Sequence, residues 1–176
     1  MFIKVLSLCA ALFAPESSGQ DPHGRSLHLK THEDFDVAYE ACIATAKQAR
    51  KHRVDPFVSI ALAYKETRMS LKYSKRSKAY HDIQHLFGCT EHKEKFIRES
   101  CSPFMLTPMY LSDLLNAFEG NYEQALCSFL SSGQRQCSSD SMREARVIKN
   151  MAKRFADVYS RTHTNFSWID PFRVQR

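Results

Sequence analysis

The stretch from Asp55 to Arg68 constrains the fold of this chain more than any other segment. Asp55 followed by Pro56 is typical of a helix start, where a side-chain oxygen caps free amides and proline needs no amide of its own. The apolar residues that follow fall on every side of the predicted helix: Phe57, Val58, Ile60, Ala61, Leu62 and Ala63. A helix that is apolar all round is a buried one. The sequence therefore predicts a central helix with the rest of the chain packed around it.

Glu66 lies near the end of this apolar helix, one turn after Leu62 and two turns after Ser59. A carboxylate against apolar side chains is costly to ionise, so its pKa tends to rise. A carboxylic acid that keeps its proton near neutral pH can act as a general acid, for instance toward a glycosidic oxygen. The alternative is a helix-end acid that pairs with Lys65, Arg68 or another base, and sequence position by itself favours that alternative.

Helical periods on either side of this segment predict the rest of an all-α domain. The predicted helices cover about residues 33–52, 79–87, 92–98, 107–120, 121–133 and 139–161. Thr31 or Asp34 could cap the first of them, and Asn121 caps the fifth. Three glycines are expected to end helices: Gly88, Gly120 and Gly133. With an exposed polar loop over 69–80, we expect about seven helices around a buried central helix.

The first residues are typical of a secretion signal. A short positive start, 1–4, precedes a mainly apolar run, Val5–Ala14, that is too short to span a bilayer. Cleavage is expected between Ala14 and Gln20, and the alternative is a buried amino-terminal helix. The predicted organisation is a signal peptide over 1–20, a flexible lead-in over 21–32, one helical domain over 33–162 and a tail over 163–176. We therefore expect a secreted or periplasmic protein with no stable membrane span.

The cysteines support an oxidising compartment, where they can pair. Removal of the leader takes Cys9 away and leaves five cysteines. The local pairs Cys89 with Cys101 and Cys127 with Cys137 would each close a short loop, although sequence does not prove connectivity. Cys42 would be left over in an apolar segment. Because no Cys or His pair has zinc spacing, a metal site is not expected.

The formal charge of +6 suits an anionic partner such as nucleic acid, a membrane or an acidic polymer. The basic residues are scattered, however, and no nucleic-acid motif accompanies them. A solvated positive surface is the simpler interpretation. We expect no nucleic-acid partner, and we expect the chain to act as a monomer.

Three blocks of sequence together resemble the lytic transglycosylase family, whose catalytic domain has the goose-type lysozyme fold. The block 54–68 resembles the family segment that ends in the catalytic Glu, and the block 118–126 resembles the family's Phe-acid-Gly-Asn-Tyr-x-x-Ala-Leu stretch. The block 102–108 lies where the family usually reads Gly-Leu-Met-Gln-x-x-Pro. The resemblance covers about residues 35–160, and it implies a lysozyme-like fold with Glu66 as the catalytic residue.

Several positions near Glu66 match or depart from that family pattern. Thr67 keeps the hydroxyl of the usual Ser, whereas Met105 replaces the family's Gln. Phe129 and Leu130 replace a Tyr-Asn pair. Four residues are therefore candidates for substrate binding: Thr67, Met105, Tyr110 and Phe129. Core packing is the alternative for Met105 and Tyr110, and for Thr67 it is an ordinary place at a helix end.

The resemblance implies peptidoglycan cleavage with a single carboxylate and no metal or organic cofactor. Glu66 would protonate the oxygen that leaves N-acetylmuramic acid, in the β-1,4 bond to N-acetylglucosamine. The substrate's own N-acetyl oxygen would stabilise the oxocarbenium-like centre, and ionised Glu66 would then deprotonate the C6 hydroxyl to give a 1,6-anhydro product. The apolar replacements motivate a second hypothesis, a binding or structural module on the same fold. A helical secreted adaptor is a third.

Overall fold

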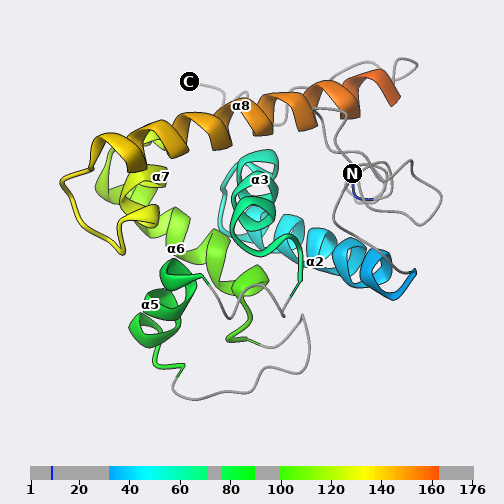
Figure 1. Cartoon of the computed structure of the whole chain (residues 1–176), viewed down its shortest axis with the longest axis horizontal. Helices are drawn as coiled ribbons and strands as arrows, with labels where there is room; N and C mark the ends of the chain where they lie inside the picture. The colour runs from blue at the N-terminus through cyan, green and yellow to red at the C-terminus, as the bar shows by residue number, and fades with distance from the viewer. Residues whose placement is uncertain (1–8, 10–31, 71–76, 90–99, 163–176) are drawn as a thin grey trace.

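The computed structural model describes residues 9, 32–70, 77–89 and 100–162, which form a helical body (Figure 1). Within these ranges there are six helices and no strand. They are α2 (His32–Lys51), α3 (Pro56–Thr67), α5 (Lys78–Leu86), α6 (Pro103–Ala117), α7 (Tyr122–Leu130) and α8 (Ser139–Thr162). The predicted all-α class is confirmed for the part of the chain that the structure describes. The predicted helix over 92–98 lies outside it.

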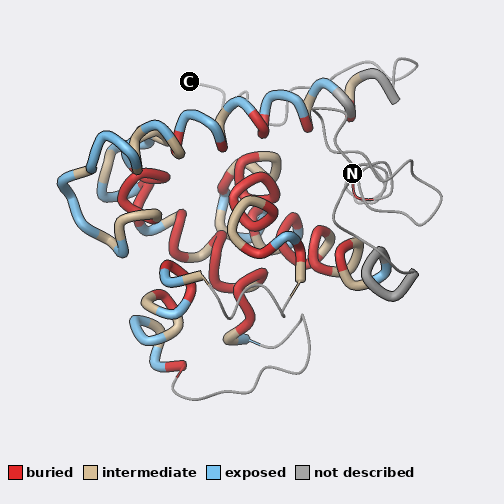
Figure 2. The backbone as a smooth tube through the Cα atoms, in the orientation of Figure 1, coloured by how far each residue is buried: buried red, intermediate tan, exposed pale blue. Residues whose placement is uncertain are grey.

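Helix α3 is the centre of the body, as its apolar sequence predicted. It is buried continuously from Val58 to Tyr64, and the other helices surround it. In Figure 1, α8 runs the full width above α3, while α2 and α6 lie below it, and all three contact α3. Figure 2 shows the buried residues concentrated on α3 and on the faces that the other helices turn toward it.

Both ends of α3 are tied down. The Asp55 carboxylate accepts the Phe57 amide at 2.7 Å, as its predicted capping role requires. The Asp55 amide in turn donates to the Tyr122 hydroxyl at 2.9 Å. At the other end Arg68 adopts a left-handed conformation, with φ of 52°, and its amide bonds back to the Tyr64 carbonyl. These hydrogen bonds therefore fix where the central helix begins and ends, and so they fix the position of Glu66 in its last turn.

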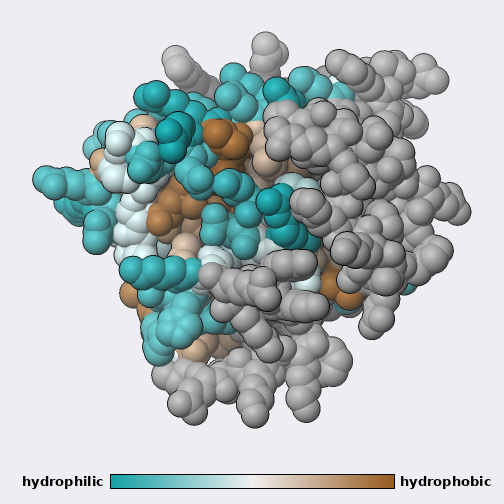
Figure 3. Space-filling model, viewed as in Figure 1, coloured by the Kyte–Doolittle hydropathy of each residue, from teal (hydrophilic) through white to brown (hydrophobic). Residues whose placement is uncertain are grey.

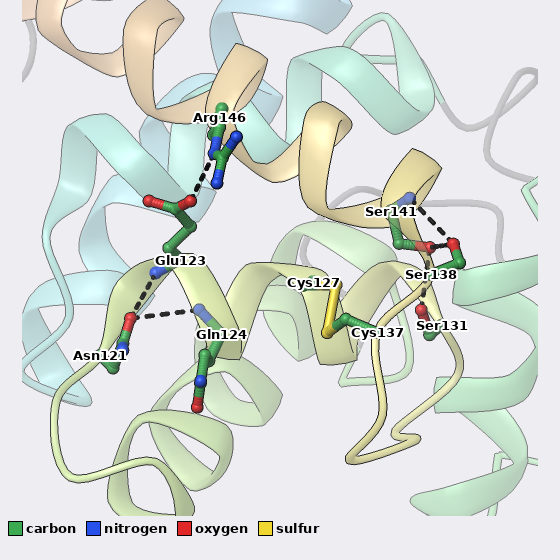
Figure 4. Close-up of a disulfide and its surroundings, with 9 residues drawn as sticks. All are labelled: Asn121, Glu123, Gln124, Cys127, Ser131, Cys137, Ser138, Ser141 and Arg146. Carbon is green, nitrogen blue, oxygen red and sulfur yellow. Dashed lines mark hydrogen bonds and ion pairs between the residues drawn. A yellow bond between two sulfur atoms is a disulfide. The ribbon is translucent and has the colours of Figure 1, made fainter.

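The block 118–126 is a tight corner between α6 and α7. Gly120 has a positive φ of 82°, a conformation that favours glycine. The Asn121 side chain then accepts the Glu123 amide at 3.1 Å and the Gln124 amide at 3.2 Å (Figure 4). With Tyr122 bonded to the cap of α3, this corner supports the central helix. The predicted Asn121 cap and the predicted glycine stops are confirmed.

Replacing Asn121 with Ala tests that corner. We expect a loss of about 1 kcal/mol of unfolding free energy, because the amides of Glu123 and Gln124 lose their acceptor. Urea unfolding of the full chain measures it. Asn116, exposed on α6, is the matched control, and its replacement with Ala should cost nothing. Equal losses for both variants would contradict the capping role.

Two sequence-based expectations about element boundaries are wrong. Helix α6 begins at Pro103, not at Thr107, because Ser102 and Pro103 form the first turn and Pro108 falls inside the helix. The segment 69–80 was expected to be an exposed loop, but its two end residues, Met69 and Tyr80, are buried in the core. Of the two residues expected to cap the first helix, Asp34 lies within α2 and Thr31 is outside the described residues, so this cap stays a prediction.

Three disulfides join the described cysteines. The predicted pairs Cys89–Cys101 and Cys127–Cys137 are confirmed, and Figure 4 shows the second of them joining α7 to the segment that follows it. The expectation that Cys42 is left over is wrong, because it pairs with Cys9 and both side chains are fully buried. That expectation assumed that Cys9 leaves with a signal peptide. The rest of the predicted signal peptide, the lead-in and the tail lie outside the described residues.

Within the described ranges, no helix combines the length and the apolar character that crossing a bilayer requires.

Candidate functional site

Glu66 is half-buried in the last turn of α3, and its carboxylate is held by a residue from another helix. The Ser77 hydroxyl donates to Glu66 Oε2 at 2.8 Å. Ser77 is the N-cap residue of α5, yet its side chain makes no capping hydrogen bond there. A serine at this position ordinarily caps its own helix. Here its hydroxyl orients Glu66 instead, so the start of α5 and the end of α3 form one site.

The surroundings of Glu66 raise the pKa of its carboxyl above the ordinary value of 4.5. Burial is the largest cause, since removal from water disfavours the charged form. The Ser77 hydrogen bond and the positive charge of Lys65 lower the pKa, and the negative charge of Glu144 raises it. The net direction is the one predicted from the apolar sequence of α3. A carboxyl that holds its proton to higher pH is suited to donate it to a leaving group.

Tyr80 of α5 lies near this carboxyl and is buried. Its hydroxyl oxygen is 2.7 Å from Thr107 Oγ1, and the Thr107 hydroxyl also lies 2.6 Å from the Pro103 carbonyl. A threonine has a single hydroxyl proton and the carbonyl can only accept. Thr107 therefore donates to Pro103, and Tyr80 donates to Thr107. Burial, together with the charge of Glu66, raises the pKa of Tyr80, so this hydroxyl stays protonated.

An aromatic row leads away from Tyr80 through the core. The Tyr80 and Phe129 rings meet edge to face with centroids 6.0 Å apart, and Phe129 lies 5.6 Å from Tyr110. Tyr110 in turn meets Phe87, which follows α5, at 6.2 Å. The Tyr110 hydroxyl lies so close to Gly133 that a Cβ there would be 2.5 Å from it. The row thus connects α5, α6 and α7.

The structure separates the predicted site residues into three environments. Thr67 and Phe129 are fully buried, and the Thr67 hydroxyl donates to the Ala63 carbonyl at 2.6 Å while accepting the Met69 amide at 3.0 Å. Tyr110 is buried in the aromatic row, where it contacts Phe129. Met105 is half-buried at the edge of the core. A raised pKa and a hydroxyl from another helix distinguish Glu66 among the predicted residues. Its catalytic role, and the role of the others in substrate binding, stay predictions.

Sequence reasoning missed Ser77, Tyr80 and Thr107 as parts of the site. Ser77 does carry a local signal, because a serine immediately before a helical run is a preferred N-cap. The hydrogen bond from Ser77 to Glu66 has no such local signal, because it joins residues at the ends of two separate helices. Tyr80 and Thr107 have ordinary core positions in their helices, and their proximity follows only from how α5 and α6 pack.

Replacing Ser77 with Ala tests its part in the site. Loss of the hydrogen bond removes an interaction that lowers the pKa of Glu66, so we expect that pKa to rise further. A carbon-detected NMR titration of the Glu66 carboxyl measures the change. Ser112→Ala is the control, because the Ser112 hydroxyl donates to the His52 carbonyl instead, and it should leave the titration of Glu66 unchanged. A fall in the Glu66 pKa in Ser77→Ala would contradict this arrangement.

Two further observations concern the described part of the chain as a whole. Figure 3 shows apolar surface gathered between α8 above and α5 below, framed by polar side chains. Among the residues that the structure describes, no cluster of three or more His, Cys, Asp or Glu side chains is arranged to hold a metal ion.

Comparison with protein-family models, with curated proteins and with solved structures found no match to this chain. The case for a function therefore depends on the residues of the site and on the three blocks of sequence resemblance.

Proposed function

We propose that this protein is a lysozyme-like enzyme of the lytic transglycosylase type, which cleaves the β-1,4 bond between N-acetylmuramic acid and N-acetylglucosamine in peptidoglycan. The observation that carries the proposal is Glu66, a half-buried carboxyl with a raised pKa that a hydroxyl from another helix holds in place. The three blocks of family resemblance support the choice of substrate. The disulfides fit an oxidising compartment outside the cytoplasm.

Glu66 performs both proton transfers in the proposed reaction. With Oε2 held by Ser77, we assign Oε1 as the oxygen that carries the proton. Protonated Glu66 gives this proton to the glycosidic oxygen while the bond to C1 of N-acetylmuramic acid breaks. The substrate's N-acetyl oxygen stabilises the positive centre, as in substrate-assisted glycosidases. Ionised Glu66 then takes the proton of the C6 hydroxyl, whose oxygen bonds to C1 and closes the 1,6-anhydro ring.

The neighbours of Glu66 support this cycle without entering it. Tyr80 stays neutral near the carboxyl, so it adds no negative charge when Glu66 ionises. Thr67 holds the end of α3 through its two backbone contacts. Positioned acid–base groups of this kind typically accelerate a reaction by about 10²–10⁴-fold. The remainder of the rate enhancement must come from binding and distortion of the sugar ring.

A binding or structural module on the same fold is the second candidate. Met105, Phe129 and Leu130 favour it, because apolar side chains occupy positions where the family has polar ones. The full burial of Phe129 fits a packing role at its position. A module of this kind would hold glycan strands and release no fragments from them.

Incubation of the purified protein with insoluble peptidoglycan separates the two candidates. The enzyme releases soluble muropeptides, and the amount grows with time. The binding module moves from the supernatant to the wall pellet and releases none. Protein that remains in the supernatant without releasing fragments would contradict both and would favour an adaptor role.

A further inference from the structure

Two histidines lie side by side on α5, at the edge of the helical body (Figure 1). His81 and His85 are four residues apart, so they occupy neighbouring turns on one face of the helix. Both residues are exposed, and their ring centroids are 4.6 Å apart with the ring planes tilted by 59°. Within the described part of the chain, neither imidazole makes a hydrogen bond or an ion pair. Their ring nitrogens are therefore available to a ligand from solution.

The separation of the two rings fits the coordination of a single metal ion. An imidazole nitrogen lies about 2.0–2.1 Å from a bound Zn²⁺ and about 1.1 Å from the centre of its own ring. Two imidazoles bound to one ion at an angle of about 90–109° therefore have ring centres about 4.5–5.2 Å apart. The observed separation of 4.6 Å falls within this range. Because both side chains are exposed, their rings can turn a nitrogen toward the same ion.

The polar neighbours of the two histidines on α5 hold the helix in place. The Ser132 hydroxyl donates to the Asp82 carboxylate, and the Gln84 amide donates to the Cys101 carbonyl at 3.1 Å. These contacts attach α5 to the segment that follows α7 and to the segment that precedes α6. The helix is thus positioned by other residues, and an ion would meet two imidazoles that the helix already keeps close together.

We propose that His81 and His85 form a two-histidine binding site for a late first-row transition-metal ion such as Cu²⁺, Ni²⁺ or Zn²⁺. Imidazole suits these ions, whereas Mg²⁺ prefers oxygen ligands. Among the described residues no third His, Cys, Asp or Glu joins the pair, so water completes the coordination of the ion. The expectation from sequence that no metal site exists overlooked the spacing of this pair. The proposal does not depend on the proposed cleavage reaction.

The two histidines lie on the same side of α5 as Ser77, which holds Glu66. Ser77 precedes His81 by four residues, and its carbonyl accepts the His81 amide at 3.2 Å. Residues four apart on a helix are neighbours on its surface. An ion bound by both histidines joins two turns of a nine-residue helix, a length that is only marginally stable by itself in water. The ion would therefore stabilise the helix that presents Ser77 to Glu66.

Calorimetric titration of the full chain with Zn²⁺ tests the proposal, with Mg²⁺ as the control ion. We expect the wild type to bind Zn²⁺ and not Mg²⁺ at this site. The variants His81→Ala and His85→Ala should each bind Zn²⁺ at least about 100-fold more weakly, because two linked ligands bind an ion more tightly than one. The control is His52→Ala, which should bind Zn²⁺ as the wild type does, since His52 Nε2 is buried.

Exchanging His85 with Leu86 separates the effect of spacing from that of composition. The double variant His85→Leu, Leu86→His keeps both imidazoles but places them five residues apart, where two side chains do not share a helix face. Leu86 is 64% exposed, so the exchange leaves the core intact. We expect Zn²⁺ binding to weaken as much as in His85→Ala. Binding as tight as in the wild type would overturn the proposal.

NMR and urea unfolding give two further readouts. Paramagnetic Cu²⁺ should broaden the amide signals of α5 before those of other helices in the wild type, and should not do so in the exchanged variant. Zn²⁺ should raise the urea midpoint of the wild type but not of His81→Ala, because an ion that binds the folded form stabilises it. Broadening centred on another helix, or Zn²⁺ binding that persists unchanged in His81→Ala and His85→Ala, would overturn the proposal. None of these readouts uses peptidoglycan, so they decide the metal site whether or not the protein cleaves it.

Discussion

Replacing Glu66 with Gln is expected to slow the clearing of purified cell walls by at least about 100-fold, the contribution of a positioned general acid. Glutamine keeps the size of the side chain and can still accept the Ser77 hydroxyl. It has no proton to give to the glycosidic oxygen and no charge with which to take one back. A turbidity assay measures the loss, and Glu123→Gln, which removes a half-buried carboxylate from another helix, should keep the wild-type rate.

Urea unfolding at several pH values shows whether an inactive Glu66→Gln variant is still folded. Because burial raises the pKa of Glu66 above 4.5, folding favours its protonated form. This contribution is complete below pH 4.5 and is lost as the pH rises through the folded pKa. Glutamine does not ionise, so the variant should gain in stability relative to the wild type between acid and neutral pH in urea unfolding. A variant that clears walls at the wild-type rate, or one inactive only because it is unfolded, would contradict the assignment.

Replacing Phe129 with Ala is expected to cost about 3–5 kcal/mol of unfolding free energy, as for other large core aromatics. The ring is fully buried between Tyr80 and Tyr110, so its removal leaves a cavity in this aromatic row. Urea unfolding measures the cost. Leu130→Ala is the control, because the neighbouring Leu130 is half-buried and its truncation should cost clearly less.

The same residue distinguishes a core role from a ligand contact. Phe129→Tyr would bury a hydroxyl in a fully packed site, which is unfavourable unless it finds a partner. We therefore expect this variant to be less stable than the wild type as well. If Phe129→Ala instead lost activity with little loss of stability, the Phe129 side chain would contact the substrate, as the resemblance to transglycosylases implies.

The central helix could be predicted from sequence because its signals are local. The cap at Asp55, the proline after it and apolar residues on every face all lie within one segment, and they identify both the buried helix and the environment of Glu66. The glycines that end helices and the two short-range disulfides could be predicted for the same reason. In each case the residues that determine the feature are near one another along the chain.

The rest of the site depends on contacts between segments, for which the sequence carries no comparable signal. Ser77 reaches Glu66 only because α5 begins beside the end of α3. The predicted start of α6 is wrong because Thr107-Pro108 and Ser102-Pro103 carry the same local signal, and burial of Phe104 and Leu106 favours the longer helix. The partner of Cys42 could not be predicted because Cys9 belongs to a segment with the features of a removable leader.

Mass spectrometry of the fragments released from peptidoglycan tests the central claim most directly. The account predicts muropeptides that end in 1,6-anhydro-N-acetylmuramic acid, lighter by one water than the hydrolysed form, from the wild type and none from Glu66→Gln. Digestion in isotopically heavy water should place no heavy oxygen in these ends, because the C6 hydroxyl and not water attacks C1. Reducing ends that carry the heavy oxygen would contradict the transglycosylase reaction, and equal product from Glu66→Gln would contradict the role of Glu66 itself.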